Sequence, residues 1–251
     1  MEVDDQKERA FLEDTAAAWD PQSPLKRGEP FPVPEKRPPA GTRVIKLPEA
    51  ELLPDREVNF LELVELRASV RSYMQTPFTL QELAYLLWCT QGVKMPIGKG
   101  GSMRNVPSAG ARHAFETYLF IQKVEGLVPG FYRYLAFEHL LLPLAEQIPW
   151  EESREAFLHA FRTRQAVEES AVTFVWVAQI ERLLYVFGKR GYRYAFLDAG
   201  HVCENLYLAA ESLKAGCCAM GAFEDAEVNR VLHLDGVREF SIYAATAGKV
   251  G

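Results

Sequence analysis

The stretch AVTFVWVA at residues 171–178 decides the fold. It is apolar apart from Thr173, and β-branched and aromatic residues dominate it. A short run of this kind is typical of a strand that is buried in the middle of a sheet. The sequence therefore predicts a central strand here, which the remaining elements have to flank and cover.

Patterns on both sides of this stretch predict the neighbouring elements. Apolar runs predict strands at 117–124, 130–134, 140–144, 217–220 and 240–246, and helical spacing predicts helices at 61–67, 79–91, 151–168, 194–213 and 225–232. The second helix opens with a capping box, Thr79-Leu80-Gln81-Glu82, and Gly92 is placed to end it. Residues 96–111 are rich in Gly, Ser and Pro and are expected to form a loop.

The long helix at 194–213 should pack on the sheet, with Leu197, His201, Leu208 and Ala209 as candidates for its inward face. Hairpin neighbours are mixed with crossovers, which favours an α+β fold over a regular doubly wound fold. A G-x-G-x-x-G dinucleotide pattern is absent from the sequence.

The first 58 residues differ from the rest of the chain. Of 15 prolines, nine fall between Pro21 and Pro54, where they disfavour a long helix or a central strand. Residues 1–19 are expected to form a short helix, with Phe11, Leu12 and Trp19 as apolar anchors. Residues 20–58 are either a floppy tail or an extended arm on a partner subunit. The arm is favoured, because the apolar residues Val44, Ile45, Leu47, Leu52 and Leu53 would otherwise face solvent. We divide the chain into an N-terminal Pro-rich arm (1–58) and a compact domain (59–251).

Composition excludes several classes of protein. The chain is 48% hydrophobic, 12% aromatic and 25% charged, which is typical of a soluble globular protein. A net charge of −6 argues against non-specific nucleic acid binding. The apolar runs are under half of the roughly 20 residues that a membrane helix needs, and no secretory signal is present. Cys89, Cys203, Cys217 and Cys218 form no C-x-x-C pair, so we expect reduced thiols in a cytoplasmic protein.

Five short segments carry residue types suited to a ligand site. The first is Arg67-Ala68-Ser69-Val70-Arg71. If it is helical, its two arginines lie on one face, where like charges repel unless an anion holds them. A guanidinium suits phosphate, and Ser69 adds a hydroxyl. The alternative is a solvated basic patch.

Three further segments are candidates for ligand contact. Two of them offer backbone groups, and the third offers one cation. In RNVPSAG (104–110), small residues let the backbone approach a flat ligand, although an ordinary surface loop explains them too. GCCAMGAF (216–223) predicts a strand entering a glycine turn, where Gly221 and Ala222 offer unpaired amides to a ligand atom that gains negative charge. Ala247-Gly248-Lys249 places a cation near the end of the sequence, which alone is a solvated lysine.

The segment DAGHVCEN (198–205) invites a Cys–His nucleophile or a metal site. Residues two apart on a helix point in different directions, so His201 and Cys203 would not meet. We expect instead a hydrogen bond between Asp198 and His201, three residues apart. No metal site is predicted, and no side chain is assigned as catalytic.

Taken in order, these motifs closely resemble the nitroreductase superfamily over about residues 60–250. Within it, the sequence is similar to the branch of the SagB-type and thiazole/oxazole-forming dehydrogenases. The ordered set is Arg67-x-Ser69-x-Arg71, Pro107-Ser108-Ala109-Gly110-Ala111, Gly130-Phe131-Tyr132-x-Tyr134 with His139-x-Leu141, Arg190-Gly191-Tyr192-Arg193-Tyr194, Gly200-His201, Asn205-Leu206 and Ala219-Met220-Gly221-Ala222-Phe223.

The resemblance implies a nitroreductase-like α+β fold, with a mixed but mainly antiparallel sheet sandwiched by helices, in a homodimer that binds FMN at its interface. It also implies residue roles. Arg67 and Ser69 would hold the phosphate and ribityl tail of FMN, and Arg71 would lie near the N1/O2 edge of its flavin ring. Further positions implied to contact the cofactor are Pro107, Ser108, Ala109 and Gly110 at the ring, Met220, Gly221 and Ala222 near N5 and O4, and Gly248 and Lys249 near the phosphate.

The function implied is an FMN-dependent oxidoreductase that passes hydride in ping-pong fashion from NAD(P)H, through the flavin, to a nitroaromatic, quinone or similar small-molecule acceptor. Two alternatives remain: a SagB-type dehydrogenase acting on a peptide-derived or other small metabolite, and a non-catalytic flavin-binding protein. Azoline-oxidising members carry a Lys-Tyr pair where this sequence has Val186-Phe187. Neither side chain ionises, so neither can act as a general base.

Overall fold

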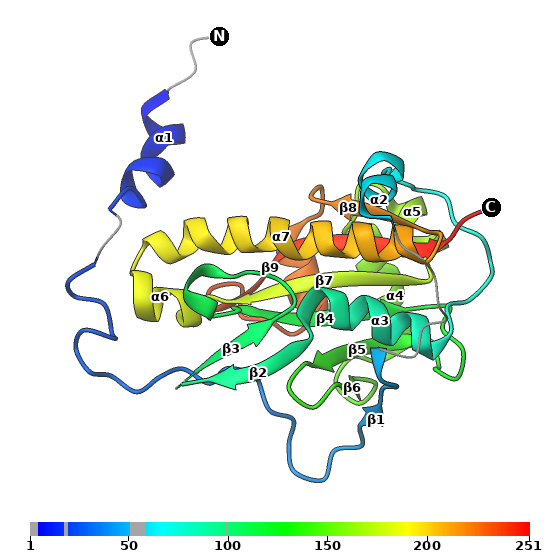
Figure 1. Cartoon of the computed structure of the whole chain (residues 1–251), viewed down its shortest axis with the longest axis horizontal. Helices are drawn as coiled ribbons and strands as arrows, with labels where there is room; N and C mark the ends of the chain where they lie inside the picture. Colours follow the sequence, from blue (N-terminus) through cyan, green and yellow to red (C-terminus); the bar gives the residue numbers. More distant parts are fainter. Residues whose placement is uncertain (1–4, 18–19, 51–58, 99) are drawn as a thin grey trace.

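The computed structural model describes residues 5–17, 20–50, 59–98 and 100–251. Its core is one seven-stranded sheet in the order β1-β6-β5-β4-β7-β9-β8, in which every pair is antiparallel (Figure 1). The expected α+β fold with a mainly antiparallel sheet is therefore confirmed. The strands are β1 (Ile45–Lys46), β4 (Phe115–Ile121), β5 (Gly130–Leu135), β6 (Leu140–Pro143), β7 (Val172–Gln179), β8 (Ala215–Met220) and β9 (Glu239–Lys249).

Strand β7 is the central strand that the sequence predicts. It pairs with β4 on one side and β9 on the other. Successive side chains of a strand point to opposite faces. Phe174 and Trp176 accordingly join one hydrophobic cluster, and Val175 and Val177 join another. All four are buried, so both faces of the sheet need a cover.

Helices supply that cover on both sides. One face packs against α3 (Leu80–Gln91) and α7 (Arg190–Ser212), and the other against α4 (Trp150–His159) and α8 (Asp225–Val231). The capping box at the start of α3 is present, with Thr79 accepting from the Glu82 amide. Figure 1 shows α7 running along the sheet. Among the described helices, none is both long and apolar enough to cross a membrane.

The inward face of α7 differs in part from the prediction. Ala209 is buried and Leu208 is half-buried, but Leu197 and His201 are exposed. The buried stripe instead includes Ala195, Ala199, Val202 and Leu206, which recur at helical spacing. Leu197 and His201 lie four residues apart on the exposed side of α7. The prediction that they face inward was therefore wrong.

Two predicted boundaries were wrong. The expected loop at 96–111 contains a hairpin of β2 (Val93–Ile97) and β3 (Gly101–Arg104), followed by the short 3-10 helix η2 (Ala109–Ala111). Gly98 and Gly100 have positive φ, so the glycines form a tight turn rather than an open loop. The expected helix at 151–168 is two helices, α4 and α5 (Arg164–Glu169), because residue Phe161 leaves the helix and bridges Phe223.

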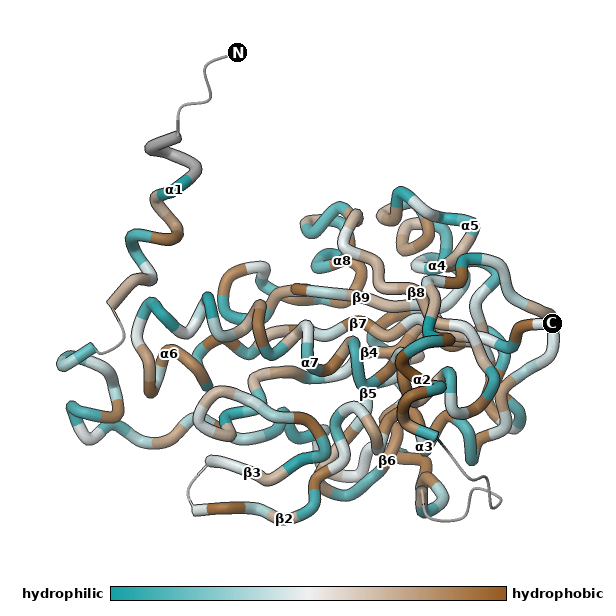
Figure 2. Tube along the Cα trace, turned by 45° about the horizontal axis from the view of Figure 1, so that its top comes forward, coloured by the Kyte–Doolittle hydropathy of each residue, from teal (hydrophilic) through white to brown (hydrophobic). Residues whose placement is uncertain are grey.

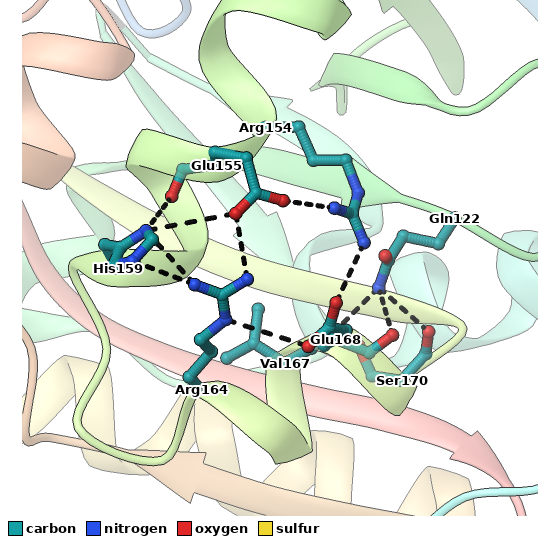
Figure 3. A network of polar contacts seen from close by, with 8 residues as sticks. All are labelled: Gln122, Arg154, Glu155, His159, Arg164, Val167, Glu168 and Ser170. Carbon is teal, nitrogen blue, oxygen red and sulfur yellow. Dashed lines mark hydrogen bonds and ion pairs between the residues drawn. The ribbon is translucent and has the colours of Figure 1, made fainter.

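A polar network joins these two helices (Figure 3). Arg164 of α5 contacts Glu155 of α4 at 2.8 Å. The Gln122 side-chain amide donates to the Val167 carbonyl at 2.8 Å and to two further carbonyls at the end of α5. Carbonyls at a helix C-terminus have no partner within the helix, so Gln122 caps α5. The ion pairs are solvent-exposed and each contributes little to stability.

Two more helices complete the compact domain, α2 (Phe60–Leu66) and α6 (Glu181–Phe187). Helix α2 ends next to Arg67, as the sequence predicts. It buries none of its own residues, and Phe60, Leu61, Val64 and Leu66 are all exposed. Figure 2 shows brown, hydrophobic segments along α2 at the surface.

The described part of the N-terminal arm lies along the chain's own domain. It begins with α1 (Asp5–Asp14), which projects from the body in Figure 1. Phe11 meets Phe196 of α7 edge-on, and β1 pairs with β6. Leu47 is buried. The proposed anchors Trp19, Leu52 and Leu53 lie outside the described residues.

Residues 33–36 fasten the arm to a buried charged cluster. The Glu35 carboxylate accepts from the Ala136 amide at 2.6 Å, and the Lys36 amide donates to Glu116 at 2.8 Å. Arg182 donates to both Glu116 and the Val33 carbonyl. Burial, and then the nearby charge of Glu116, raises the pKa of Glu35 from 4.5 to about 7.

This raised pKa predicts a pH effect on stability. The folded state binds a proton at Glu35 that the unfolded state releases between pH 4.5 and 7, so ionisation of Glu35 costs stability as the pH rises through that window. Glu35→Gln keeps an acceptor for the amides and cannot ionise. We expect its free energy of unfolding to rise relative to wild type from pH 4.5 to 7, by at most ~3 kcal/mol.

Urea unfolding at several pH values measures this difference. Glu138→Gln is the control, because Glu138 is the neighbouring exposed carboxylate. Parallel pH profiles for wild type and Glu35→Gln would contradict the assignment.

Candidate functional site

Residues 67–71 form an extended segment rather than the helix considered above. Arg67 is the C-cap of α2, with φ −49° and ψ 119°. Beyond it Ser69 bridges Cys217 in parallel, and the Val70 amide donates to the Cys217 carbonyl at 2.9 Å. Strand β8 is at the edge of the sheet and has unpaired backbone groups to offer. Backbone pairing with this edge outweighs continuation of α2.

The two arginines of this segment have no carboxylate partner among the described residues. The Arg67 guanidinium lies over the Tyr207 ring, 5.3 Å from its centroid. Arg71 is exposed and donates to the Ser69 carbonyl at 3.3 Å. Two cations beside an exposed hydroxyl at Ser69 form a donor set suited to an oxyanion such as phosphate.

Tyr207 of α7 fixes this segment against β8. The Ala219 amide donates to the Tyr207 oxygen at 2.7 Å, and the Tyr207 and Ser69 hydroxyls are 2.9 Å apart. Burial raises the pKa of Tyr207, so the phenol keeps its hydrogen. With the Ala219 amide pointing at it, the phenol can donate to Ser69, which leaves the Ser69 hydrogen for a ligand. Sequence reasoning missed Tyr207, although it follows Cys203 by four residues on the buried stripe of α7.

The loop at 107–110 is attached to the other half of α7. Ser108 donates to the Asp198 carboxylate at 2.6 Å, and the Ala109 amide donates to it at 3.1 Å. Gly110 has a φ of +55°, and a Cβ there would lie 2.9 Å from Phe187. Pro107 and Gly110 are exposed. The loop is therefore held rigidly with part of its surface in solvent.

The expected Asp198–His201 hydrogen bond does not form. The Asp198 carboxylate accepts from Ser108 and Ala109 instead, and His201 is exposed. Burial raises the pKa of Asp198, while the two hydrogen bonds oppose that shift. Burial also raises the pKa of Cys203 to about 12, which leaves no thiolate nucleophile there. The described residues contain no cluster of three or more metal-ligating side chains.

The turn after β8 has the free amides that the sequence predicts. Met220 is buried at the end of the strand, while Gly221 and Ala222 are exposed. Within the described part of the chain, no acceptor pairs with the amide of Gly221 or of Ala222. The Ala222 carbonyl accepts from the Arg162 amide at 3.1 Å, which fixes the turn and leaves both N–H groups available to a ligand.

Gly248 and Lys249 lie at the end of β9, which pairs with the inner side of β8, while residues 69 and 70 pair with its outer side. Gly248 pairs with Gly216 of β8, and a Cβ on Gly248 would come within 2.8 Å of the Tyr73 ring. The Lys249 ammonium contacts Glu82 and lies 5.4 Å from the Phe78 centroid. Burial acts to raise the pKa of Glu82, but Lys249 and Thr79 together bring it below its usual value. Lys249 is thus already neutralised by Glu82.

The predicted site residues fall into two groups along α7. Segments 67–71, 220–222 and 248–249 are distributed along β8, with 248–249 beside its first residues and 220–222 at its end, and β8 is tied to Tyr207. The loop at 107–110 is tied to Asp198, nine residues earlier, or roughly 13 Å along the helix axis. Four surface cavities of 320–630 Å³ are lined by other residues. Neither group lines any of these four cavities of the described chain.

Tyr207→Phe should lower the free energy of unfolding by about 1–3 kcal/mol, because the Ala219 amide and Ser69 lose their shared partner. Tyr192→Phe is the matched control on the same helix, since no hydrogen bond of the Tyr192 hydroxyl occurs among the described residues. Denaturant unfolding of both variants measures the effect. Equal stabilities would show that Tyr207 does not hold the segment.

Comparison with known proteins identifies the family. The model of the nitroreductase family matches residues 64–249. Over 208 residues the chain is 31% identical to "Putative nitroreductase MJ1384" of Methanocaldococcus jannaschii, covering 83% of this chain and 97% of that protein.

Two solved structures, each of a "putative nitroreductase", are also similar to this chain. A protein from Ralstonia eutropha is 25% identical with a TM-score of 0.62, and the match covers 89% of this chain and 98% of that one. Another from Anabaena variabilis is 26% identical with a TM-score of 0.59, and covers 75% of this chain. This chain spans only 37% of the Anabaena variabilis chain.

Two more distant structures share the fold. One is in the E. coli microcin synthetase McbBCD complex with truncated pro-MccB17 bound, at 19% identity and a TM-score of 0.62, covering 96% of this chain and 86% of that one. The other is a Desulfovibrio desulfuricans protein in complex with FMN, at 15% identity and a TM-score of 0.53, covering 77% and 87%. With the antiparallel sheet and the family match over residues 64–249, these findings show that the chain belongs to the nitroreductase family.

Proposed function

We propose that this protein is an FMN-dependent NAD(P)H oxidoreductase that reduces a nitroaromatic, quinone or similar small acceptor. The observation that carries the proposal is the donor set at β8. Among the described residues, Arg67 and Arg71 have no acidic partner, and the Gly221 and Ala222 amides have no acceptor. The Ser69 hydroxyl is free to donate to a ligand when Tyr207 donates to it. The FMN bound to the Desulfovibrio desulfuricans relative supports this choice of cofactor.

In this proposal each segment has a distinct task. Arg67 and Ser69 bind the phosphate and ribityl tail, while Gly248, against which the Tyr73 ring packs, holds the neighbouring backbone in place. Arg71 stabilises negative charge at the N1/O2 edge, and the amides of Gly221 and Ala222 donate to the ring near N5 and O4. Bound FMN would supply the hydride chemistry, while the protein would orient the cofactor and tune its electrostatic environment. Lys249 would lie near the phosphate, but its ion pair with Glu82 offsets its charge, so Arg67 is the main cation for the phosphate.

We further propose a homodimer in which the loop at 107–110 comes to the ring from a second copy. The roughly 13 Å between Asp198 and Tyr207 along α7 supports this, because the loop is anchored that far from the donors at β8. Exposed apolar side chains on α2 and at Phe196 and Leu197 of α7 are suited to an interface. The arm would then contribute contacts to the dimer in addition to those it makes with its own domain.

A second candidate is a SagB-type dehydrogenase acting on a peptide-derived metabolite, favoured by the fold shared with the microcin synthetase complex. The residues around Val186-Phe187 weigh against azoline oxidation. Phe187 packs on Gly110 and Tyr194. The nearby Tyr185 donates its hydroxyl hydrogen to the Glu29 carbonyl of the arm at 2.7 Å. Lys189 is exposed and lies 3.6 Å from Asp14 of α1. Tyr185 and Lys189 are the nearest ionisable side chains that could replace the missing base, and each contacts the arm, Lys189 only through an exposed ion pair.

The purified protein should be yellow, or become so with FMN, and NADH or NADPH should bleach it. A panel of nitroaromatics and quinones should then reoxidise it. Absorbance spectroscopy follows all three steps. A colourless protein that takes up no FMN would contradict the proposal, and a reduced flavin that no acceptor reoxidises would favour a non-catalytic flavin-binding protein.

Arg67→Ala should weaken FMN binding by roughly 1.5–3 kcal/mol, or about 10- to 150-fold, through loss of one charge-assisted hydrogen bond. Fluorescence titration of the apoprotein with FMN measures this. Arg43→Ala serves as the control, since Arg43 is an exposed arginine of the arm. Unchanged affinity in Arg67→Ala would overturn the phosphate assignment.

A further inference from the structure

A second polar site lies on the sheet face that α4 and α8 cover. A cavity of about 320 Å³ opens there between the arm, strands β4 to β6 and the end of α8. Its polar lining consists of Lys36, Arg37, Tyr118, Arg133, Gln147 and His233. The rest of the lining is apolar, and no carboxylate lines it. None of the residues assigned to FMN contributes to this cavity.

Two buried groups of the lining lack adequate partners. Tyr118 is 5% exposed, and its hydroxyl has no hydrogen-bond partner among the described residues. Burial raises its pKa to about 12, so it remains a donor. Arg133 is 3% exposed, and the one polar partner of its guanidinium in the described chain is Glu116 at 3.5 Å. A well-formed pair of this kind is about 2.7–2.9 Å long.

Glu116 does not fully compensate Arg133, because its other oxygen is already occupied. That oxygen accepts from Arg182 and from the Lys36 amide. Buried donors are normally satisfied by protein or by ordered water, and a ligand oxyanion can take the place of that water. Tyr118 and Arg133 therefore offer donors to whatever enters the cavity.

The rim adds positive charge. Lys36 is balanced by Glu239 at 2.6 Å. Arg37 is exposed and has no partner among the described residues. Arg37 and Arg133 together thus exceed the nearby negative charge. A guanidinium matches the geometry of a carboxylate or phosphate, and the apolar floor suits a short hydrophobic body.

We propose that this cavity binds a small oxyanion, a phosphate or carboxylate group with a short apolar body, through Arg37, Arg133 and Tyr118. The site is separate from the proposed flavin site, because Arg133 and Tyr118 lie on the sheet face opposite α7. Since Lys36 and Arg37 belong to the arm, the bound anion also fastens the arm to the domain.

Calorimetric titration of the full chain, kept saturated with FMN so that the proposed phosphate site at Arg67 is occupied, tests this proposal. The probes are inorganic phosphate, phenyl phosphate and benzoate, with sodium chloride at matched ionic strength as the reference. We expect saturable binding that chloride does not reproduce, with phenyl phosphate tighter than inorganic phosphate. The comparison of phenyl phosphate with benzoate shows which oxyanion the site prefers.

Four variants locate the binding. Tyr118→Phe and Arg37→Ala should each weaken it at least fivefold, while Arg43→Ala and Arg67→Ala should leave it unchanged. Tyr118→Phe removes only an unpartnered hydroxyl, so unfolding curves should match wild type or show higher stability. The proposal is overturned by absence of saturable binding, by equal affinities in all four variants, or by loss of binding in Arg67→Ala, which would move the anion to the proposed flavin site.

Discussion

Strand β7 has no face in contact with solvent, and the rest of the fold follows from this constraint. Its neighbours β4 and β9 satisfy its backbone, while Trp176 and Phe174 on one face and Val175 and Val177 on the other require cover. Helix α7 lies on one face because its buried stripe contains small alanines that allow close approach. That placement brings Tyr207 to the edge strand β8, where it meets the extended segment after α2.

The candidate site is therefore a product of sheet edge and helix together. Residues 69 and 70 pair with the outer backbone edge of strand β8, and Tyr207 links Ser69 to Ala219. The result places two guanidiniums, a hydroxyl and two amides along one edge, and within the described residues the guanidiniums have no carboxylate partner and the amides have no acceptor. Rigid positioning of such donors is what a cofactor-dependent enzyme contributes when the cofactor carries the chemistry. The arm acts elsewhere, on the buried cluster of Glu35, Glu116 and Arg182.

Much of the fold could be predicted from local pattern. The run at 171–178, the capping box at Thr79 and the hairpin strands at 130–134 and 140–144 all appear where periodicity placed them, because burial and caps act over a few residues. The hairpin at Val93–Arg104 was not predicted, because a Gly-rich segment is typical of a loop. The positive φ values that make these glycines a tight turn are a property of the folded structure. The face of α7 was chosen wrongly for Leu197 and His201, because an amphipathic stripe can be rotated when alanines rather than large residues pack inward.

The site was harder to predict, because its geometry depends on contacts between distant residues. Nothing in the sequence from Arg67 to Arg71 indicates pairing with Cys217, and nothing near Asp198 indicates that it holds Ser108 rather than His201. Order and type of residue identified the segments, whereas tertiary packing decided their conformation.

A crystal structure of the FMN-loaded protein tests the central claim most directly. The account predicts the FMN phosphate within hydrogen-bond distance of Arg67 and the Ser69 hydroxyl, and the isoalloxazine ring against the amides of Gly221 and Ala222, with residues 107–110 of a second copy across the ring. A flavin bound away from β8, or FMN enclosed by one chain without a second copy, would contradict it.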